Sequence, residues 1–304
     1  MPPRSPRAGT RMRPASTGRV PNSSNMPQTR ASDALNWPER QSLTGLITPS
    51  MPTTELQAAL EAALAAAQVI RSLFQKNLSV RSKADASPVT EADLRAEEVI
   101  REHLTRAFPG YGFYGEETGQ HAMQAESLWL VDPIDGTKAF VRENPFFSTQ
   151  IALMRAGELV LGVSSAPLYG ELAWAERGSG AFLNDKSVRV SGVARLEDAF
   201  ISSGNLRSLA RSPTWRRFGA LLGRAACTRG YGDFVHYHLL ARGGVDVVIE
   251  SDVNILDIAA LAVLVREAGG VFTDLTGASV GLDTRSVLAA NATLHQQVLD
   301  ELRR

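Results

Sequence analysis

Two segments of the chain carry apolar residues at three- and four-residue spacing, which is the period of a helix that buries one face. The first covers residues 55–77, where the apolar stripe consists of Leu56, Leu60, Leu64, Ala67, Ile70 and Phe74. The second begins at Thr90, with Asp93 three residues on as in a capping box, and it ends at Pro109-Gly110. We therefore expect two long amphipathic helices.

Short apolar runs separated by turn signals follow these helices. Residues 128–131 form a continuous apolar run that stops at Asp132-Pro133, as a strand buried on both faces would. Further apolar runs cover residues 149–154, 159–164 and 171–175 and are separated by turns rich in Gly and Pro, and we expect residues 178–180, 182–183 and 188–190 to extend the same arrangement. This spacing predicts an antiparallel meander.

The last third of the chain alternates strand and helix patterns. Residues 245–249 are strand-like, and residues 258–268 are helical up to Gly269-Gly270, which is a typical helix end. The remaining expected elements are strands at residues 271–272 and 288–290 and a closing helix at residues 296–302.

Composition excludes several classes of protein. The 304 residues hold 32 Lys+Arg and 32 Asp+Glu, and this balance argues against general binding to nucleic acid or to an anionic membrane. The single cysteine, Cys227, permits no internal disulfide. No uninterrupted apolar run approaches the roughly 20 residues that span a bilayer. We therefore expect a cytoplasmic protein.

The charge is unevenly spread along the chain. Residues 1–50 contain seven arginines, two acids and eight of the fifteen prolines, without helical or strand periodicity. Such a segment buries too little apolar surface to offset its ordering entropy, so we expect it to be disordered. Three alternatives stay open: a transit peptide, a gene-model artefact with translation starting at Met51, and an arm that docks weakly to RNA, an anionic membrane or an acidic partner.

The sharpest candidate for chemistry is the segment Asp-Pro-Ile-Asp-Gly-Thr, residues 132–137. Pro133 fixes one backbone angle and Gly136 permits a tight bend, so that both carboxylates and the Ile134 carbonyl can face one point. An all-oxygen set of this kind suits a hard divalent cation, Mg²⁺ in particular. A helix starting at Gly136-Thr137 would also offer free N–H groups to a phosphate. The alternative is an ordinary Asp-Gly turn.

Three other acidic positions lie at element boundaries, and each has a structural alternative. Glu116, followed by Glu117, lies between two glycines, where a solvated acidic loop is the alternative. Asp93 fits the third position of a capping box, and Asp257 fits the N-cap of the helix expected over residues 258–268. All four acidic sites, in this order, favour shared chemistry over four unrelated turns and caps.

This combination resembles the inositol monophosphatase family, within the wider lithium-sensitive, magnesium-dependent phosphatase superfamily. The resemblance covers residues 55–300 and rests on the segment 132–137, the upstream Gly-Glu-Glu, and the downstream acid-Ile-Ala-Ala helix with Glu-Ala-Gly-Gly. It implies an α/β layered fold, the α-β-α-β-α sandwich of inositol monophosphatases and fructose-1,6-bisphosphatases. An antiparallel sheet would occupy residues 51–190 and a smaller mixed sheet residues 191–304, with the active site between them. Family members are commonly dimers, which implies a homodimer.

The resemblance also implies two or three Mg²⁺ ions. Ligands of the first ion would be Glu116, Asp132 and the carbonyl of Ile134. Ligands of the second would be Asp132, Asp135 and Asp257. Glu116 would hold the third ion through water. The chain departs from the family at Leu256, where members usually place Trp beside the metal-binding acid.

The remaining implied roles concern water and phosphate. Thr137 and Asp93 would polarise the attacking water, and the N–H groups of Gly136 and Thr137 would contact the phosphate. Together with Glu116, Asp93 and Thr137 form the predicted catalytic set. The implied reaction is hydrolysis of a small phosphomonoester by metal-activated water. The alternative from another class is a catalytically silent member that acts as a binding module.

The substrate is predicted less sharply. Glu250 lies seven residues before Asp257 and matches the acid that binds an inositol hydroxyl in the family. Residues 232–241 and the Val-Ile-Glu-Ser around Glu250 also look similar to the histidinol-phosphate phosphatase branch, where Asp233 and Glu250 would complement an ammonium group. We predict an inositol monophosphate-like ester, with histidinol phosphate as the alternative. Fructose 1,6-bisphosphate and adenosine 3′,5′-bisphosphate are less favoured, because no Lys/Arg cluster is evident for their extra charge.

Overall fold

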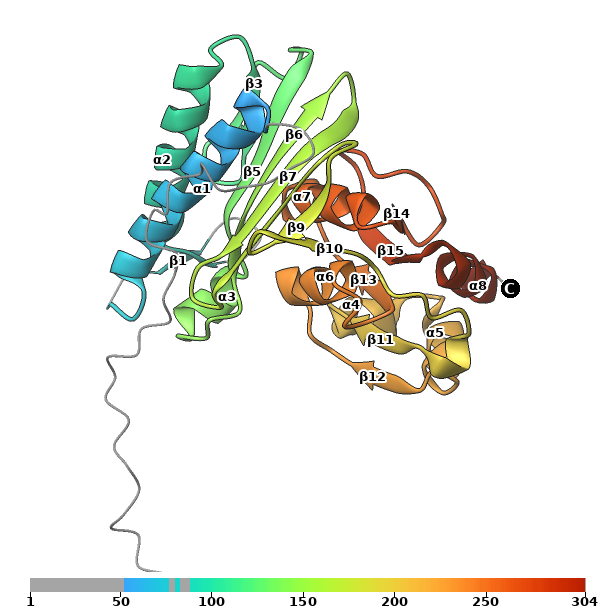
Figure 1. Ribbon diagram of the computed structural model, residues 1–304. Helices are drawn as coiled ribbons and strands as arrows, with labels where there is room; N and C mark the ends of the chain where they lie inside the picture. The colour runs from blue at the N-terminus through green and yellow to red at the C-terminus, as the bar shows by residue number, and fades with distance from the viewer. Residues whose placement is uncertain (1–51, 77–79, 83–87, 304) are drawn as a thin grey trace, which may run out of the picture. The chain divides into compact units, whose positions relative to one another are not determined.

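The computed structural model describes residues 52–76, 80–82 and 88–303 (Figure 1). The predicted disordered leader, residues 1–50, and the alternative start at Met51 lie outside these described residues. Within them, no helix has the length and apolar character needed to cross a membrane.

The two predicted amphipathic helices are present and lie side by side against one face of a large sheet (Figure 1). Helix α1 (Thr54–Leu73) ends before the predicted residue 77, because Phe74 adopts an extended conformation and becomes the C-cap. Helix α2 (Glu91–Ala107) begins as predicted, since Thr90 is its N-cap and forms a capping box with Asp93.

The large sheet has eight strands in the order β10-β9-β8-β7-β6-β5-β3-β4. In chain order they are β3 (Gly112–Gly115), β4 (Gly119–His121), β5 (Ser127–Asp135), β6 (Ser148–Arg155), β7 (Glu158–Ala166), β8 (Glu171–Glu176), β9 (Gly180–Leu183) and β10 (Lys186–Val188). Strands β5 to β10 pair antiparallel with their sequence neighbours, which confirms the predicted meander, while β3 pairs parallel with β5. A separate ribbon joins β1 (Arg81–Ser82) to β2 (Pro88–Val89).

Strand β5 is an inner strand of the large sheet and is buried on both faces. Trp129 and Val131 belong to the core between the sheet and helices α1 and α2. Leu128 and Leu130 face the opposite core. This two-sided burial explains why residues 128–131 form an unbroken apolar run rather than an alternating one.

Helices α6 (Asp233–Ala241) and α7 (Ile255–Glu267) form the central layer, and α7 packs against strands of both sheets. Helix α7 begins three residues earlier than predicted, because Asn254 is its N-cap. The interpretation of Asp257 as an N-cap is therefore wrong: it is the third helical residue and closes a capping box with Asn254. Apolar residues surround a helix that is buried on all sides, so their pattern does not mark where it starts.

The second sheet has five strands in the order β12-β11-β13-β15-β14. They are β11 (Phe200–Ser203), β12 (Cys227–Arg229), β13 (Val247–Ser251), β14 (Gly270–Thr273) and β15 (Ser286–Asn291). Its pairing is mixed, as expected: β11 is parallel to β12 and β13, and β15 is antiparallel to β13 and β14.

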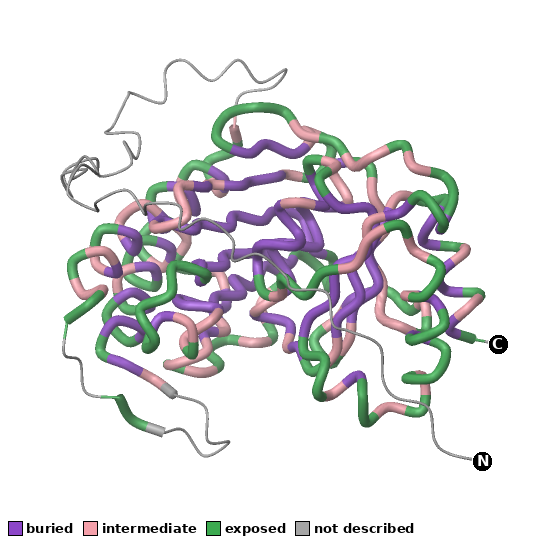
Figure 2. Tube along the Cα trace, turned by 90° about the horizontal axis from the view of Figure 1, so that it is seen from below, coloured by how far each residue is buried: buried purple, intermediate pink, exposed green. Residues whose placement is uncertain are grey.

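The outer layer on this sheet contains helices η2 (Leu196–Asp198), α4 (Leu206–Arg211), α5 (Trp215–Leu222) and α8 (Ala292–Arg303). Buried residues follow the strands and the inward faces of the helices (Figure 2). The layers therefore follow the predicted α-β-α-β-α order. Strands β11 and β12 and helix α4 were not predicted, because each is too short to display a clear period. Helix α5 was also missed, although its buried residues Phe218 and Leu221 have helical spacing.

Candidate metal centre

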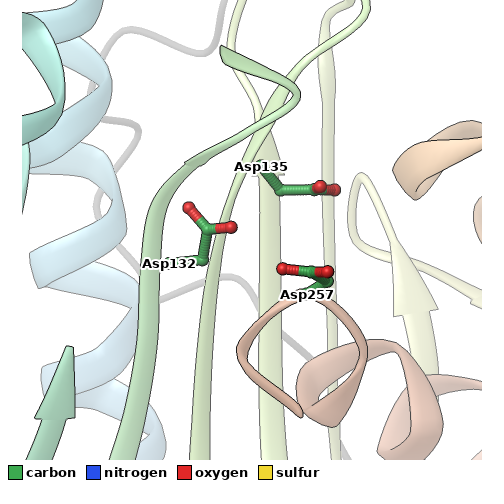
Figure 3. Close-up of side chains that lie close together, drawn as sticks. All are labelled: Asp132, Asp135 and Asp257. Carbon is green, nitrogen blue, oxygen red and sulfur yellow. The ribbon is translucent and has the colours of Figure 1, made fainter. Parts of the chain in front are cut away.

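Three aspartates from two elements meet where strand β5 passes the start of helix α7. Asp132 and Asp135 come from β5 and Asp257 from the first turn of α7, and each offers a carboxylate oxygen within 4.8 Å of the other two (Figure 3). The predicted end of this strand at Asp132-Pro133 is wrong, because β5 continues through both aspartates to Asp135. From Asp132 to Asp135 the pairing moves three positions along β5 but only two positions along β6, which is a β-bulge. A bulge re-aims side chains, which allows two residues three apart to face the same point.

Burial and mutual repulsion disfavour the ionised forms of these carboxylates, which makes the cluster a candidate cation site. Burial and the carboxylates of Glu116, Asp135 and Asp257 raise the pKa of Asp132 well above its ordinary value. Burial, with the carboxylates of Asp233 and Asp257, does the same to the pKa of Asp135. Burial raises the pKa of Asp257 to about 7, although Asn254 donates hydrogen bonds that oppose the shift. Buried carboxylates without a countercharge are costly, and they are normally paired or bound to a metal.

One carboxylate oxygen of the cluster is available to a metal ion. Asp135 Oδ2 is buried, and among the described residues it has no hydrogen-bond partner. A metal ligand needs a free lone pair of this kind, and carboxylate oxygens are the donors that hard divalent cations prefer. The residues present therefore fit a hard divalent cation.

Glu116 joins the cluster from the turn between β3 and β4. Its carboxyl group contacts that of Asp132 by a side-chain hydrogen bond and contributes to the raised pKa values of Asp132 and Asp257. The Glu116 N–H donates to the Val131 carbonyl at 3.1 Å, which ties the turn to the residue before Asp132. Glu116 is therefore half-buried beside Asp132, which differs from the alternative of a solvated acidic loop.

Asp93 and Thr137 form a second contact at the edge of the cluster. Asp93 is fully buried, and its Oδ2 accepts hydrogen bonds from the Thr90 N–H at 2.7 Å and the Thr90 hydroxyl at 2.6 Å. Its other oxygen, Oδ1, lies 3.2 Å from the Thr137 hydroxyl, which also lies 3.0 Å from the Ile134 carbonyl. The capping box thus occupies one oxygen of Asp93 and leaves the other facing Thr137.

The expected helix start at residues 136–137 is present. Helix α3 (Thr137–Val141) follows Gly136, whose φ of 94° lies in the left-handed region that favours glycine. A Cβ at this position would also lie 3.0 Å from the Phe146 carbonyl oxygen. The first N–H groups of a helix have no partner within it, so this turn presents donors beside the carboxylate cluster.

Glu250 and Asp233 border the cluster on the side of the second sheet. Glu250 on β13 is buried and accepts hydrogen bonds from the Tyr237 hydroxyl at 2.7 Å and from His236 Nε2 at 3.1 Å. Asp233, the exposed first residue of α6, has a pKa raised to about 6 by desolvation from the groups around it and by the Glu250 carboxylate. Charge interactions connect Asp233 with Asp135, and Glu250 with Asp135 and Asp257.

Sequence reasoning missed the residues that hold these acids in place. Glu97 is fully buried and accepts two N–H groups of the Glu116 turn. The available signal was its position on the apolar face of α2, one turn after Asp93. Tyr237 and His236 hold Glu250, and no local pattern connects them with it.

The raised pKa values predict how the stability of the metal-free protein depends on pH. Asp257 has an ordinary pKa of 3.8 and a folded-state pKa of about 7, so the folded protein binds protons that the unfolded chain has lost between these values. The free energy of unfolding in EDTA should therefore fall as the pH rises across this interval. Asp257→Asn should flatten this dependence in thermal unfolding followed by circular dichroism. Equal pH slopes for the two proteins would contradict the prediction.

Comparisons with known proteins show which sequences and solved structures this chain resembles. The sequence profile of the inositol monophosphatase family matches residues 51–304. The histidinol-phosphatase of Mycobacterium tuberculosis is 41% identical over 258 residues, covering 83% of this chain and 99% of that protein. The inositol-1-monophosphatase of Mesorhizobium japonicum is 36% identical over 244 residues, covering 75% of this chain and 88% of that protein. The crystal structure of extragenic suppressor protein suhB from Bartonella henselae superposes with a TM-score of 0.77 at 32% identity, covering 83% of this chain and 99% of that one.

Proposed function

The chain belongs to the inositol monophosphatase family and is a phosphoric monoester hydrolase, and from this premise we propose that it uses Mg²⁺ to release phosphate from a small amino-alcohol or polyol monoester. The observation that carries the proposal is the cluster of Asp132, Asp135 and Asp257, two of them buried and Asp257 half-buried, whose carboxylates converge without a countercharge among the described residues. The Asp93–Thr137 pair and the start of α3 lie beside it.

The residues that would hold the ions are those that the sequence predicted. Asp132, with Glu116 and the Ile134 carbonyl, would hold one Mg²⁺, and Asp132, Asp135 and Asp257 would hold a second. When bound, such ions act as Lewis acids that neutralise phosphate charge and make water more acidic. A third ion at Glu116 remains part of the same proposal.

Thr137 and Asp93 would act on the attacking water. When the Thr137 hydroxyl donates its single proton to Asp93 Oδ1, its lone pairs can accept a hydrogen bond from water. Accepting that bond increases the negative charge on the water oxygen, which makes it a better nucleophile. Asp93 is kept in place by the capping box, so the direction of this hydrogen bond is set before substrate arrives.

The start of α3 would bind the phosphate itself. The N–H groups of Gly136 and Thr137 would donate to phosphate oxygens, as helix N-termini commonly do. The short distance in sequence from Asp135 to Thr137 brings the phosphate contacts, a metal ligand and the water-polarising hydroxyl onto one turn.

Asp233 and Glu250 favour a cationic leaving group. Two carboxylates border the cluster on one side, and the Asp233 pKa of about 6 leaves that group ionised near neutral pH. An ammonium group would satisfy both acids, and the relative in Mycobacterium tuberculosis is named a histidinol-phosphatase. We therefore propose histidinol phosphate as the preferred substrate. An inositol monophosphate is the second candidate, because Glu250 can also accept hydrogen bonds from vicinal hydroxyls.

A substrate panel with matched variants tests this preference. We expect higher kcat/KM for histidinol phosphate than for inositol 1-phosphate, fructose 1,6-bisphosphate or adenosine 3′,5′-bisphosphate. Glu250→Gln and Asp233→Asn should lower kcat/KM for histidinol phosphate about 10- to 100-fold, since hydrogen bonds to charged groups contribute about 1.5–3 kcal/mol. Both variants should affect inositol 1-phosphate less.

The control for this experiment is Asp252→Asn, which removes an exposed negative charge two residues after Glu250. It should leave the preference unchanged. Equal losses on both esters in the Glu250 and Asp233 variants would contradict the proposed recognition of an ammonium group.

The homodimer and the cytoplasmic location stay predictions.

A further inference from the structure

Glu97 lies on α2 one turn after Asp93 and is fully buried. Its neighbours on the same face of the helix, Ala96 and Ile100, are apolar and equally buried. A carboxylate in such surroundings is costly unless hydrogen-bond donors surround it. The donors that Glu97 finds are therefore the reason that an acid can occupy this position.

Those donors come from the turn that carries Glu116. Glu97 Oε2 accepts the Glu117 N–H at 2.8 Å, and Glu97 Oε1 accepts the Thr118 N–H at 2.6 Å. The preceding N–H, that of Glu116, donates to the Val131 carbonyl at 3.1 Å. Three consecutive N–H groups are thus bound, two by α2 and one by β5, and the turn is fixed at both of its supports.

The glycine before the turn, Gly115, leaves the space that the Glu97 carboxylate occupies. A Cβ placed on Gly115 would collide with the Glu97 carboxylate and with the ring of Phe113. The segment Gly-Glu-Glu-Thr, residues 115–118, therefore combines a position without a side chain, which admits Glu97, with two N–H groups that bind it.

We propose that Glu97 is a positioning residue, which holds the Glu116 turn so that the Glu116 carboxyl faces Asp132 as a preformed metal ligand. The proposal rests on the proposed function in one respect, namely that Glu116 binds metal. Helix α2 then supplies two parts of the site one turn apart: Asp93 for the water and Glu97 for the ligand turn. Residues that orient metal ligands typically change metal affinity or activity 10- to 100-fold when replaced.

The chemistry requires a carboxylate and not merely a polar side chain. Each Glu97 oxygen accepts from a different N–H, so both ends must be acceptors. A glutamine of the same shape has one acceptor and one donor end, and its NH₂ would face an N–H donor. Glu97→Gln therefore tests the contact without changing the volume of the side chain.

The experiment titrates the intact protein with Mn²⁺ and with Mg²⁺ by calorimetry, in the absence of substrate. We expect Glu97→Gln to weaken metal binding about 10-fold or more while thermal unfolding confirms that the variant is folded. With a substrate that is hydrolysed, the metal concentration for half-maximal rate should rise and kcat at saturating metal should stay within a few-fold of the wild type. Glu98→Gln, at the exposed neighbouring position, is the matched control and should change neither quantity.

A second variant keeps the test decisive if Glu97→Gln does not fold. Gly115→Ala places a methyl group against the Glu97 carboxylate and should weaken metal binding by a similar factor. Because both changes break the same contact, the double variant should bind metal about as tightly as either single variant. Unchanged metal affinity in a folded Glu97→Gln or Gly115→Ala protein would overturn the proposal. Because binding is measured without substrate, a failure to hydrolyse any ester would refute the proposed function and leave this test intact.

Discussion

Asp132→Asn should lower kcat/KM for phosphate release by about 10³-fold or more while the protein stays folded. Asp132 is the carboxylate whose charge neighbours include all the other proposed acidic metal ligands, Glu116, Asp135 and Asp257. Because Asp132 is the ligand proposed to be shared by both ions, its replacement should weaken both metal sites together. Metal ions contribute several kcal/mol of transition-state stabilisation, and about 4 kcal/mol corresponds to 10³ in rate. Removal of metal by EDTA should have an equally large effect.

The measurement pairs activity with stability. The variant should unfold in EDTA at a temperature no lower than that of the wild type, because the substitution removes a charge that its neighbours repel. Asp185→Asn, in the exposed turn between β9 and β10, is the control for the loss of one acid and should retain full activity. Retention of most Mg²⁺-dependent turnover in Asp132→Asn would refute the assignment of the site.

The long elements of the fold were predictable because each repeats its pattern many times. Helices α1 and α2 display several turns of one apolar stripe, and β5 announces its two-sided burial through the run at residues 128–131. Strands β11 and β12 contain four and three residues, which is too few to show a period. Their place in the sheet is set by pairing between distant segments: β11 pairs with β13, far along the chain, and β12 pairs with β11.

The candidate acids were predictable from their order along the chain, whereas their supports were not. Glu97 contacts residues 20 and 21 positions away, and Glu250 contacts Tyr237 and His236 at 13 and 14 positions. No local rule connects such pairs, because they meet only when separate elements pack. The bulge in β5 is equally invisible, since it is defined by the register with β6.

The structural and chemical interpretations of Asp93 and Asp257 do not exclude each other. Both are third residues of helices and both close capping boxes, with Thr90 and Asn254 respectively. A helix start needs such an acceptor for its own stability. The cap therefore fixes each carboxylate at the end of its helix, and the packing of α2 and α7 against the same sheet then brings both ends to β5. Helix capping thus helps to position two of the carboxylates of the site.

This double role makes Asp93→Asn the most informative single change after Asp132. The asparagine oxygen can still accept from Thr90 and preserve the cap, but its NH₂ group would then face the Thr137 hydroxyl. The hydroxyl would accept where it had donated, and its proton would point away from Asp93. General-base assistance is worth about 10²–10⁴ in rate, so we expect kcat to fall by about 10²-fold or more with little change in metal affinity.

Thr90→Ala separates the two roles of Asp93. It removes the capping hydroxyl and should lower the free energy of unfolding by about 1 kcal/mol, while the contact between Asp93 and Thr137 and most of kcat are kept. Thr137→Val should reproduce the loss of kcat, and adding Asp93→Asn to it should cost little more, because both changes break one hydrogen bond. Additive losses in that double variant would show that Asp93 acts on the reaction by a route other than Thr137.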